Sequence, residues 1–360
     1  MTPEETLAAR RLPTIKNREE AIHILLENEY GFLPNTPFSW QTDDPVLIKR
    51  LPSETPCEIS RTNMTVSSPL GSHTFPVGRL LHGDGKKHPL FVLLNFSSEI
   101  PDFYYPAETI ADRGYDVISV CYRDVTEDND DFSDGLAGVF GIDRTKSNAA
   151  GKIMVWAFAA MRLLDYALTL PSVDPARCCV IGHSRLGKTA LVAGMLDPRF
   201  SFVCSNDSGC GGASLYRGSL GQTGGAGKYG GPGESLSVTY EKINFRYWYC
   251  PNRYRDMEKN YPEGYDQHFL LASIAPRFLL VGSADMDDWA DPASEQLCCL
   301  AASPAWEAFG VPGLVHCGHV LDKDESLDEG HIAYHRRSGS HFLSVRDWEF
   351  YMDYMDKQKK

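Results

Sequence analysis

Five short apolar runs recur between positions 89 and 285, and most are separated by stretches with helical periodicity. The runs are PLFVLLNF (89–96), YDVISVCY (115–122), RCCVIGHS (177–184), FSFVCSND (200–207) and IAPRFLLVGSAD (274–285). The helical stretches are 107–114, 151–170, 186–197, 293–309 and 344–358. Strands that alternate with helices in this way are typical of a parallel sheet, and right-handed crossovers place the helices on both of its faces. The sequence therefore predicts an α/β fold, a three-layer α/β/α sandwich with a mostly parallel central sheet.

The remaining segments predict additions to one domain over residues 1–360. An N-terminal extension of helix and loop covers about 1–55, with a helix over 17–30 and a loop over 31–45. Residues 56–82 alternate polar and apolar side chains, which indicates an antiparallel pair at the sheet edge. Two insertions, at about 123–149 and 212–265, interrupt the alternation, and the first of them is long and acidic.

Charge and cysteine content narrow the function classes. The net charge of −13 would repel a phosphate backbone or an anionic membrane, so we expect neither nucleic-acid nor membrane partners. No signal-peptide pattern is visible, which predicts a cytoplasmic protein with reduced thiols; the alternative is a secreted protein whose signal has been removed. The ten cysteines show no zinc-binding spacing. We therefore expect no metal and no cofactor, and favour a monomer.

A glycine-rich segment, SLGQTGGAGKYGGPGES (219–235), stands within the second insertion. It lacks the G-x-x-x-x-G-K-[ST] pattern of a phosphate-binding loop, and no strand precedes it. The composition predicts a flexible or irregular surface loop.

The stretch GHSRLGKTAL (182–191) joins a predicted strand to a predicted helix. It resembles the G-x-S-x-G nucleophile elbow of the α/β-hydrolase fold, except that Leu186 stands where the second glycine is expected and Gly187 follows. A strand-to-helix turn exposes the serine Oγ, so Ser184 is the candidate nucleophile. The alternative is that Ser184 only caps the following helix.

The general base of such a site is a histidine late in the chain, because the order in α/β-hydrolases is serine, acid, histidine. His341 lies in a Gly/Ser-rich turn directly before the last predicted helix, whereas His331 and His335 alternate with apolar residues and fit a strand. Two acids are open. Asp207 follows the strand after the serine and Asp285 follows the next core strand, so either or both would orient the imidazole.

Arg185 and Lys188 place two cations beside the candidate nucleophile. Such charges suit a substrate that carries negative charge, and Arg185 would also stabilise an oxyanion. Surface salt bridges are the alternative explanation for both residues.

These motifs together resemble the glucuronoyl esterases of carbohydrate esterase family 15. The resemblance spans roughly residues 85–355 and rests on GHSRLGKTAL, SNDSGCGGASLYRG (205–218), FRYWYC (245–250), DQHFLLASIAPRFLLVGSADMDDWADP (266–292) and IAYHRRSGSHFLSVRDWEFYMDY (332–354). It implies Ser184 as nucleophile, His341 as base and Arg185 as a helper of the oxyanion. The acid corresponds to Asp207 or Asp285, with Asp207 slightly favoured.

The resemblance also implies a sugar-binding set and a disulfide. Lys188 and Trp289 match residues that contact the uronate, and Gln222 stands where relatives carry a glutamate, for which Glu234 could substitute. Cys210 and Cys250 match positions that pair in bacterial members. His183 departs from the fungal members, which have a cysteine before the serine.

The function that we expect is hydrolysis of (4-O-methyl-)glucuronate esters of plant cell-wall carbohydrate through an acyl-enzyme, with a small-molecule or oligosaccharide uronate ester as substrate. An acetyl xylan esterase or another carbohydrate esterase on the same fold is the alternative within this class. A non-catalytic carbohydrate-binding homologue is the alternative from another class.

Overall fold

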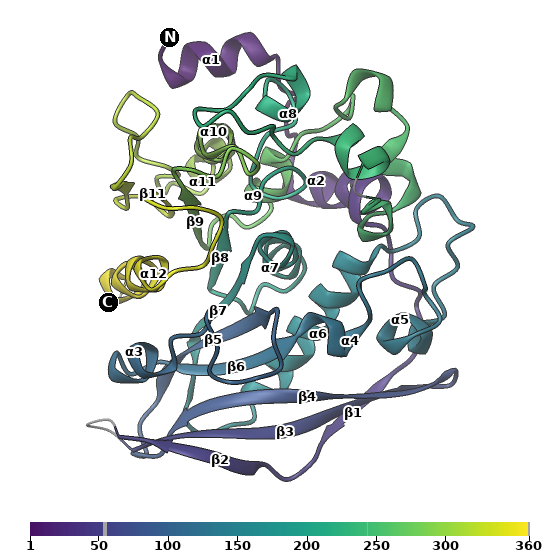
Figure 1. The fold of residues 1–360 in the computed structure, drawn as a ribbon, viewed down its shortest axis with the longest axis vertical. Helices are drawn as coiled ribbons and strands as arrows, with labels where there is room; N and C mark the ends of the chain where they lie inside the picture. The colour runs from purple at the N-terminus through teal and green to yellow at the C-terminus, as the bar shows by residue number, and fades with distance from the viewer. Residues whose placement is uncertain (53–55, 243, 359–360) are drawn as a thin grey trace.

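The computed structural model of the protein describes residues 1–52, 56–242 and 244–358, and its strands join in one mixed sheet (Figure 1). The strands are β1 Ser39–Thr42, β2 Val46–Leu51, β3 Cys57–Ser68, β4 Gly71–His82, β5 His88–Asn95, β6 Asp116–Cys121, β7 Val173–His183, β8 Phe202–Asn206, β9 Phe278–Ala284, β10 Glu325–Leu327 and β11 Ile332–Arg337. Their order across the sheet is β1–β3–β4–β6–β5–β7–β8–β9–β11–β10, and β2 also pairs with β3.

The centre of this sheet is parallel and buried. β5 pairs in parallel with β6 and β7, and the parallel pairing continues through β8, β9 and β11. Every residue of β5, β6 and β8 is buried, which is why these strands stand in the sequence as unbroken apolar runs. The predicted edge pair over 56–82 forms β3 and β4, which are antiparallel. The mostly parallel central sheet is thus confirmed.

Helices cover both faces of the sheet, with α3 and α12 on one side and α6 and α7 on the other (Figure 1). The α-helices are α1 Pro3–Arg10, α2 Arg18–Leu25, α3 Ala107–Asp112, α4 Tyr122–Val125, α5 Gly135–Phe140, α6 Lys152–Ala167, α7 Arg185–Leu196, α8 Leu220–Thr223, α9 His268–Ala272, α10 Pro292–Ala302, α11 Pro304–Glu307 and α12 Val345–Lys357. The π-helices are η1 Leu26–Tyr30 and η2 Val238–Lys242, and the 3-10 helices are η3 Arg246–Trp248, η4 Pro251–Tyr254 and η5 Met257–Lys259. Among these described helices, none is both long and apolar enough to cross a membrane.

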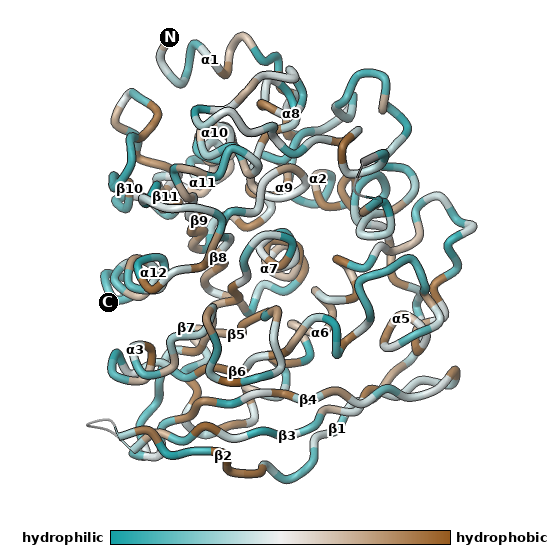
Figure 2. The backbone as a smooth tube through the Cα atoms, viewed as in Figure 1, coloured by the Kyte–Doolittle hydropathy of each residue, from teal (hydrophilic) through white to brown (hydrophobic). Residues whose placement is uncertain are grey.

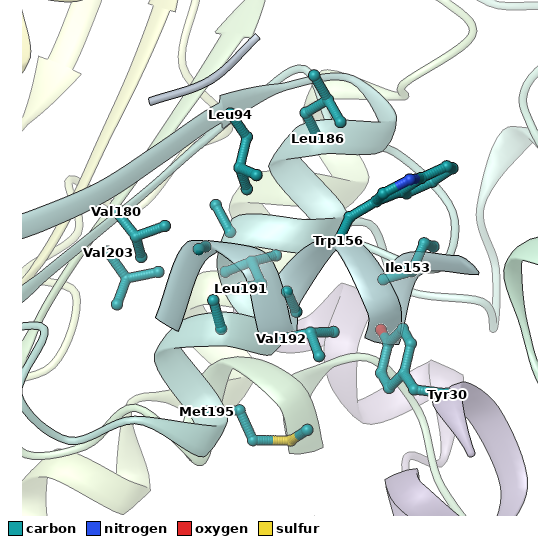
Figure 3. Close-up of a cluster of buried hydrophobic side chains, with 14 of the residues drawn as sticks. Tyr30, Leu94, Ile153, Trp156, Val180, Leu186, Leu191, Val192, Met195 and Val203 are labelled. Carbon is teal, nitrogen blue, oxygen red and sulfur yellow. The ribbon is translucent and has the colours of Figure 1, made fainter. Parts of the chain in front are cut away.

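Successive residues of the buried strands feed a hydrophobic cluster on each face of the sheet. Leu90 and Val92 of β5 belong to the cluster that α6 and α7 cover, part of which is drawn in Figure 3. Phe91, between them, belongs to the other cluster and packs edge-on against Trp348 of α12, with ring centroids 5.0 Å apart. Because side chains of a strand alternate between faces, one apolar run supplies both layers. Apolar residues accordingly concentrate along the central strands (Figure 2).

Two element predictions are wrong in detail. The predicted helix over 293–309 is divided into α10 and α11, because Pro304 has no N–H to continue the helical hydrogen bonding. The stretch 31–45, expected as a loop, contains β1, which pairs with β3. The N-terminal extension therefore contributes β1 and β2 to the sheet edge. The assignment of residues 1–360 to one domain with additions stays a prediction.

Two stacked histidines lie at the edge of the sheet where β5 and β6 begin. The rings of His82 and His88 are 4.2 Å apart and nearly parallel. His82 contacts Asp116 Oδ1 through Nδ1 (2.8 Å) and the Ala111 carbonyl through Nε2 (3.1 Å). Since both of these oxygens are acceptors, the ring satisfies them together only when both of its nitrogens carry protons. Burial acts to lower the pKa of His82, but the hydrogen bond and charge of Asp116 outweigh it and raise this pKa above its usual value.

We expect the free energy of unfolding to fall as the pH rises through the raised pKa of His82. The stabilisation is complete below the unfolded-state pKa of histidine, about 6.5, and is lost above it as the folded ring loses its proton. Urea unfolding at pH 6 and pH 9 measures this loss. In His82→Gln the pH dependence should be smaller, and the free energy at pH 6 lower by about 1.5–3 kcal/mol, as for loss of a charge-assisted hydrogen bond. Equal pH dependence in the two proteins would contradict the assignment.

Candidate active site

Ser184 occupies a strained turn between β7 and α7. Its backbone has φ 57° and ψ −125°, a region that residues with a side chain rarely adopt. Such strain costs about 1–3 kcal/mol and is concentrated at functional sites. The Ser184 amide donates to the Asn206 carbonyl of β8 (2.8 Å), which fixes the turn, and its side chain makes no capping hydrogen bond to α7. The geometry is that of a nucleophile elbow.

Two glycines explain the altered elbow motif. A Cβ at Gly182 would lie 2.1 Å from the Leu186 carbonyl oxygen, so the turn closes only around glycine at that position. A Cβ at Gly187 would lie 3.0 Å from Ser208 Cβ and 3.1 Å from the Asn206 carbonyl oxygen. The glycine expected at position 186 is therefore unnecessary here: Leu186 is fully buried in the core (Figure 3), and Gly187 provides the close approach of α7 to the end of β8.

His341 lies in the turn between β11 and α12, and its acid partner is Asp287. The distance from His341 Nδ1 to Asp287 Oδ2 is 2.5 Å. The side chain of Asp287 is 3% exposed and that of His341 is 37% exposed, so the imidazole is open on one side and anchored on the other. Because Nδ1 is occupied by the carboxylate, Nε2 is the nitrogen left to exchange a proton with a serine.

Asp285 forms no hydrogen bond or ion pair with His341, contrary to expectation. Its carboxylate is held by Lys228 (3.1 and 3.2 Å), by Arg336 (3.0 Å) and by the Tyr229 hydroxyl. Asp285 directly follows β9, and two residues further the turn brings Asp287 to the imidazole. The assignment of the acid to Asp285 is therefore wrong by two positions in the same turn.

Asp207 lies beside the His341–Asp287 pair without forming that hydrogen bond. One ligand atom from each of Asp207, Asp287 and His341 lies within 4.8 Å of the other two. Asp207 Oδ1 accepts from the Ala284 amide (2.6 Å), whereas Oδ2 is buried without a hydrogen-bond partner among the described residues. Burial, followed by the charge of Asp287, raises the pKa of Asp207 well above its ordinary value. The slight preference for Asp207 as the partner of His341 is thus also corrected in favour of Asp287.

The ring of His183 packs beside the imidazole of His341. Its ring centroid is 4.4 Å from that of His341 and 5.5 Å from that of Tyr104, and its Nδ1 lies 2.6 Å from Asn206 Oδ1. Burial, and next the proximity of His341, lower the pKa of His183 to about 3. His183 is therefore neutral at physiological pH and adds no competing positive charge beside His341.

Arg185 begins α7 and points into a cluster of aromatic rings. Its guanidinium carbon lies 4.6 Å from the centroid of the Trp248 ring and 5.1 Å from that of Phe245. Its Nη1 donates to Asp128, a residue of the acidic insertion. Its Nε is buried without an acceptor in the described part of the chain. The alternative of a surface salt bridge does not fit, since the Asp128 side chain is 4% exposed.

Lys188 is buried and pairs with Glu234. Its ammonium donates to Glu234 Oε2 (2.8 Å), to the Cys210 carbonyl (2.7 Å) and to the Ser208 carbonyl. An ammonium has three N–H donors, so protein acceptors use them all. The Glu234 amide donates to the carbonyl of Trp289 (2.9 Å), whose side chain is half-buried. The structure thus brings Lys188, Glu234 and Trp289 together.

Gln222 is separate from this group. Its Oε1 accepts from the Gly218 amide (3.1 Å), and it lines a groove with Arg10, Arg11 and Arg217. Of these two candidates for sugar binding, Glu234 lies beside Lys188 and Gln222 does not.

The glycine-rich segment begins with the short helix α8, which the sequence did not predict, and is irregular after it; this part is bound to the turn that carries the acid. The amides of Tyr229 and Gly231 donate to Asp288 Oδ2 (2.9 and 2.8 Å), and Lys228 pairs with Asp285. Asp285 and Asp288 flank Asp287 in the sequence, so the segment holds the acid's turn from outside.

The implied disulfide is absent, and the possible metal ligands of the described residues fall into two groups. All ten cysteines, Cys210 and Cys250 among them, are free thiols. In the described residues, possible ligand atoms gather at His82, His88 and Asp116 and at Asp207, Asp287 and His341. In each group one histidine is hydrogen-bonded to an aspartate, His82 to Asp116 and His341 to Asp287.

Comparison with protein families identifies the family of this chain. The profile of the family described as "Glucuronyl esterase, fungi" matches residues 82–310, which include the elbow, Asp207 and Asp287. The chain belongs to the glucuronyl esterase family. The match ends before His341, whose assignment rests on the hydrogen bond described above.

Individual relatives are named as a carbohydrate esterase or as glucuronoyl esterases. The carbohydrate esterase MZ0003 from an unknown prokaryotic organism is 35% identical over 249 residues, which is 68% of this chain and 54% of the relative. A 4-O-methyl-glucuronoyl methylesterase of Neurospora crassa is 32% identical over 209 residues, 55% of this chain and 50% of the relative. The chain thus spans about half the length of these curated relatives. The structure of a glucuronoyl esterase from Solibacter usitatus superposes with a TM-score of 0.79 at 28% identity, covering 96% of this chain and 92% of that one. These likenesses confirm the α/β-hydrolase fold.

Sequence reasoning missed Asp287 and Asp128. Asp287 belongs to the run ADMDDWAD, in which four aspartates fall within seven residues, and sequence alone does not rank them. Asp128 stands among several acidic residues of a loop and is 57 positions from Arg185. A buried carboxylate in an acidic loop has no local sequence signal.

Proposed function

We propose that this member of the glucuronyl esterase family hydrolyses carboxylic esters of glucuronic acid and of its 4-O-methyl ether. The observation that carries the proposal is the His341–Asp287 pair next to His183, the residue directly before the strained Ser184. The relatives named 4-O-methyl-glucuronoyl methylesterase support the substrate class.

The reaction proceeds in two halves through Ser184. Ser184 Oγ attacks the ester carbonyl while His341 Nε2 takes its proton, and Asp287 stabilises the imidazolium that forms. The alcohol then leaves with the proton from His341, and the uronate remains as an ester on Ser184. A water molecule, deprotonated by the same nitrogen, attacks this acyl-enzyme and releases glucuronic acid and free Ser184.

The N-terminus of α7 stabilises the negative charge of the tetrahedral intermediate. The first N–H groups of a helix have no partner within it, and that of Arg185 directly follows the nucleophile. The cationic Arg185 side chain adds a charged donor at the same place.

The sugar ring is bound by the group formed by Glu234, Lys188 and Trp289. Glu234 accepts hydrogen bonds from sugar hydroxyls, and the Trp289 ring supplies an apolar face against the pyranose. Lys188 acts through Glu234, since its own donors are used within the protein.

Hydrolysis of three esters tests the proposal. Benzyl glucuronate is expected to give a kcat/KM at least about 10-fold above benzyl galacturonate, because the galacturonate misplaces one hydroxyl that the site would bind. The kcat/KM for benzyl glucuronate should exceed that for an aryl acetate by a larger factor, since the acetate lacks the sugar. Faster hydrolysis of the acetate would instead support the acetyl esterase alternative, and no hydrolysis of any ester would support a binding protein.

Replacing Glu234 by glutamine is expected to raise KM for benzyl glucuronate about 10-fold while kcat stays within about threefold. A hydrogen bond present equally in ground and transition states affects KM alone. Gln222→Ala is the matched control and should leave both constants unchanged, because Gln222 lines a different groove. Steady-state kinetics together with thermal unfolding of each variant make the comparison. An effect of Gln222→Ala equal to that of Glu234→Gln would reverse the assignment.

A further inference from the structure

One acidic residue of the first insertion is buried although its neighbours face solvent. Glu127, Asp130 and Asp131 are exposed, whereas the side chain of Asp128 is 4% exposed. An ionised carboxylate is buried only where hydrogen bonds and opposite charge compensate its lost hydration. The surroundings of Asp128 must therefore provide both.

Four side chains direct hydrogen-bond donors at the Asp128 carboxylate. Oδ2 accepts from Arg185 Nη1 and from the Tyr122 hydroxyl (3.0 Å). Oδ1 accepts from Trp248 Nε1 (2.7 Å), and the Tyr247 hydroxyl lies 3.1 Å from Oδ1 and 2.8 Å from the Asp128 carbonyl oxygen. A carboxylate offers about four acceptor positions, so these donors fix its orientation.

The same residues confine the Arg185 guanidinium from a second direction. Trp248 donates to Asp128 through its indole N–H and presents its ring to Arg185 at 4.6 Å. Phe245 adds a second ring at 5.1 Å, stacked on Trp248 with centroids 3.9 Å apart. A cation is attracted to an aromatic face, and the carboxylate binds the edge of the guanidinium. The long arginine side chain is thereby held in one position.

Both insertions contribute to this arrangement. Asp128 lies in the first insertion and Tyr122 directly before it, and Phe245, Tyr247 and Trp248 lie in the second. The guanidinium so held belongs to the residue after the nucleophile, and its Nε is a buried donor without an acceptor among the described residues. The Arg185 side chain as a whole is 23% exposed, so part of it stays accessible to a bound ligand.

We propose that Asp128 is a positioning residue, which holds Arg185 where its guanidinium stabilises the oxyanion formed at Ser184. The inference rests on the proposed ester hydrolysis and extends it to a residue that does not touch substrate. Without Asp128 the guanidinium keeps its charge and its aromatic contacts but gains freedom to leave the reacting oxygen. Displacement of a catalytic group by about 1 Å can cost about 100-fold in rate, so the expected loss is in kcat.

The test compares Asp128→Asn with Asp130→Asn, an exposed acid of the same loop. Asp128→Asn is expected to lower kcat for benzyl glucuronate about 10–100-fold with KM within about threefold, and Asp130→Asn should match the wild type. In the Arg185→Ala background, Asp128→Asn should have less than about a threefold further effect, because its partner is already gone. A merely structural role would lower kcat in both backgrounds.

A fluorophosphonate provides a readout that does not depend on the sugar. Attack of Ser184 on its phosphorus also develops charge on an oxygen, so Asp128→Asn should slow labelling about as much as it lowers kcat. Wild-type protein that is labelled but does not hydrolyse glucuronate esters would refute the proposed function and leave the labelling comparison to test Asp128. Wild-type rates in Asp128→Asn, or faster ones, would overturn the positioning role.

If Asp128→Asn does not fold, Tyr247→Phe tests the same inference. It removes one hydroxyl donor to Asp128 and keeps the ring. We expect about a threefold to 10-fold lower kcat with unchanged KM in the native background and no effect in Arg185→Ala. If Tyr247→Phe left kcat unchanged in both backgrounds, the positioning role of Asp128 would be excluded.

Discussion

Replacing Ser184 by alanine is expected to lower kcat for benzyl glucuronate by at least about 10⁴-fold. The variant retains the binding group and the oxyanion donors but has no atom to form the acyl-enzyme. KM should stay within about threefold, since the hydroxyl acts in the reaction and not in ground-state binding. Release of benzyl alcohol measures the rate, and circular dichroism shows whether the fold persists.

Labelling by a fluorophosphonate identifies the nucleophile independently. The wild type should be labelled at one serine, and Ser184→Ala should not react. Ser326→Ala, at an exposed serine of β10, is the control and should be labelled at the wild-type rate. Labelling that persists without Ser184 would mean that another residue is the nucleophile.

The fold and the elbow could be predicted because their signals are local. Strands such as β5 are buried on both faces, so side chains of both faces are mostly apolar and the strand stands out as an apolar run. Ser184 was found because a strand and a helix meet at one residue, and this junction survives the exchange of a glycine for Leu186. The close contacts at Gly182 and Gly187 show why the exchange is tolerated.

The sequence does not show which aspartate pairs with His341, because this depends on the backbone path of one turn. Asp285, Asp287 and Asp288 follow β9, and each carboxylate has a different partner: Lys228 and Arg336, His341, and the amides of the glycine-rich segment. Which aspartate faces His341 follows from backbone angles that composition does not encode. Proximity to the strand end predicted the correct turn and the wrong residue.

The sequence also does not predict which distant residues pack around the elbow. Gln222 and Glu234 both lie in the glycine-rich segment, and only the folded segment shows that Glu234 returns to Lys188. The same holds for Asp128, whose burial depends on aromatic residues more than 100 positions later.

Replacing Asp287 by asparagine is expected to lower kcat by about 10³–10⁴-fold, with little change in KM. The imidazole would lose the charge that stabilises its protonated form. The asparagine amide can also donate to Nδ1, which favours the tautomer with a proton on Nε2, and that tautomer cannot accept the proton of Ser184. Single-turnover and steady-state rates with benzyl glucuronate measure the loss.

The neighbouring aspartates decide whether this effect belongs to Asp287. Asp207→Asn should lower kcat by no more than about 10-fold, because the carboxylate hydrogen-bonded to His341 is that of Asp287, and an asparagine Oδ1 can still accept from the Ala284 amide as Asp207 does. Asp285→Asn should change kcat by less than about threefold, since the partners of its carboxylate among the described residues are Lys228, Tyr229 and Arg336 and do not include the imidazole of His341. A loss in Asp207→Asn as large as that in Asp287→Asn would mean that both carboxyl groups must be ionised together. The two charges would then share the imidazolium, and the raised pKa of Asp207 would fall as His341 takes up the serine proton.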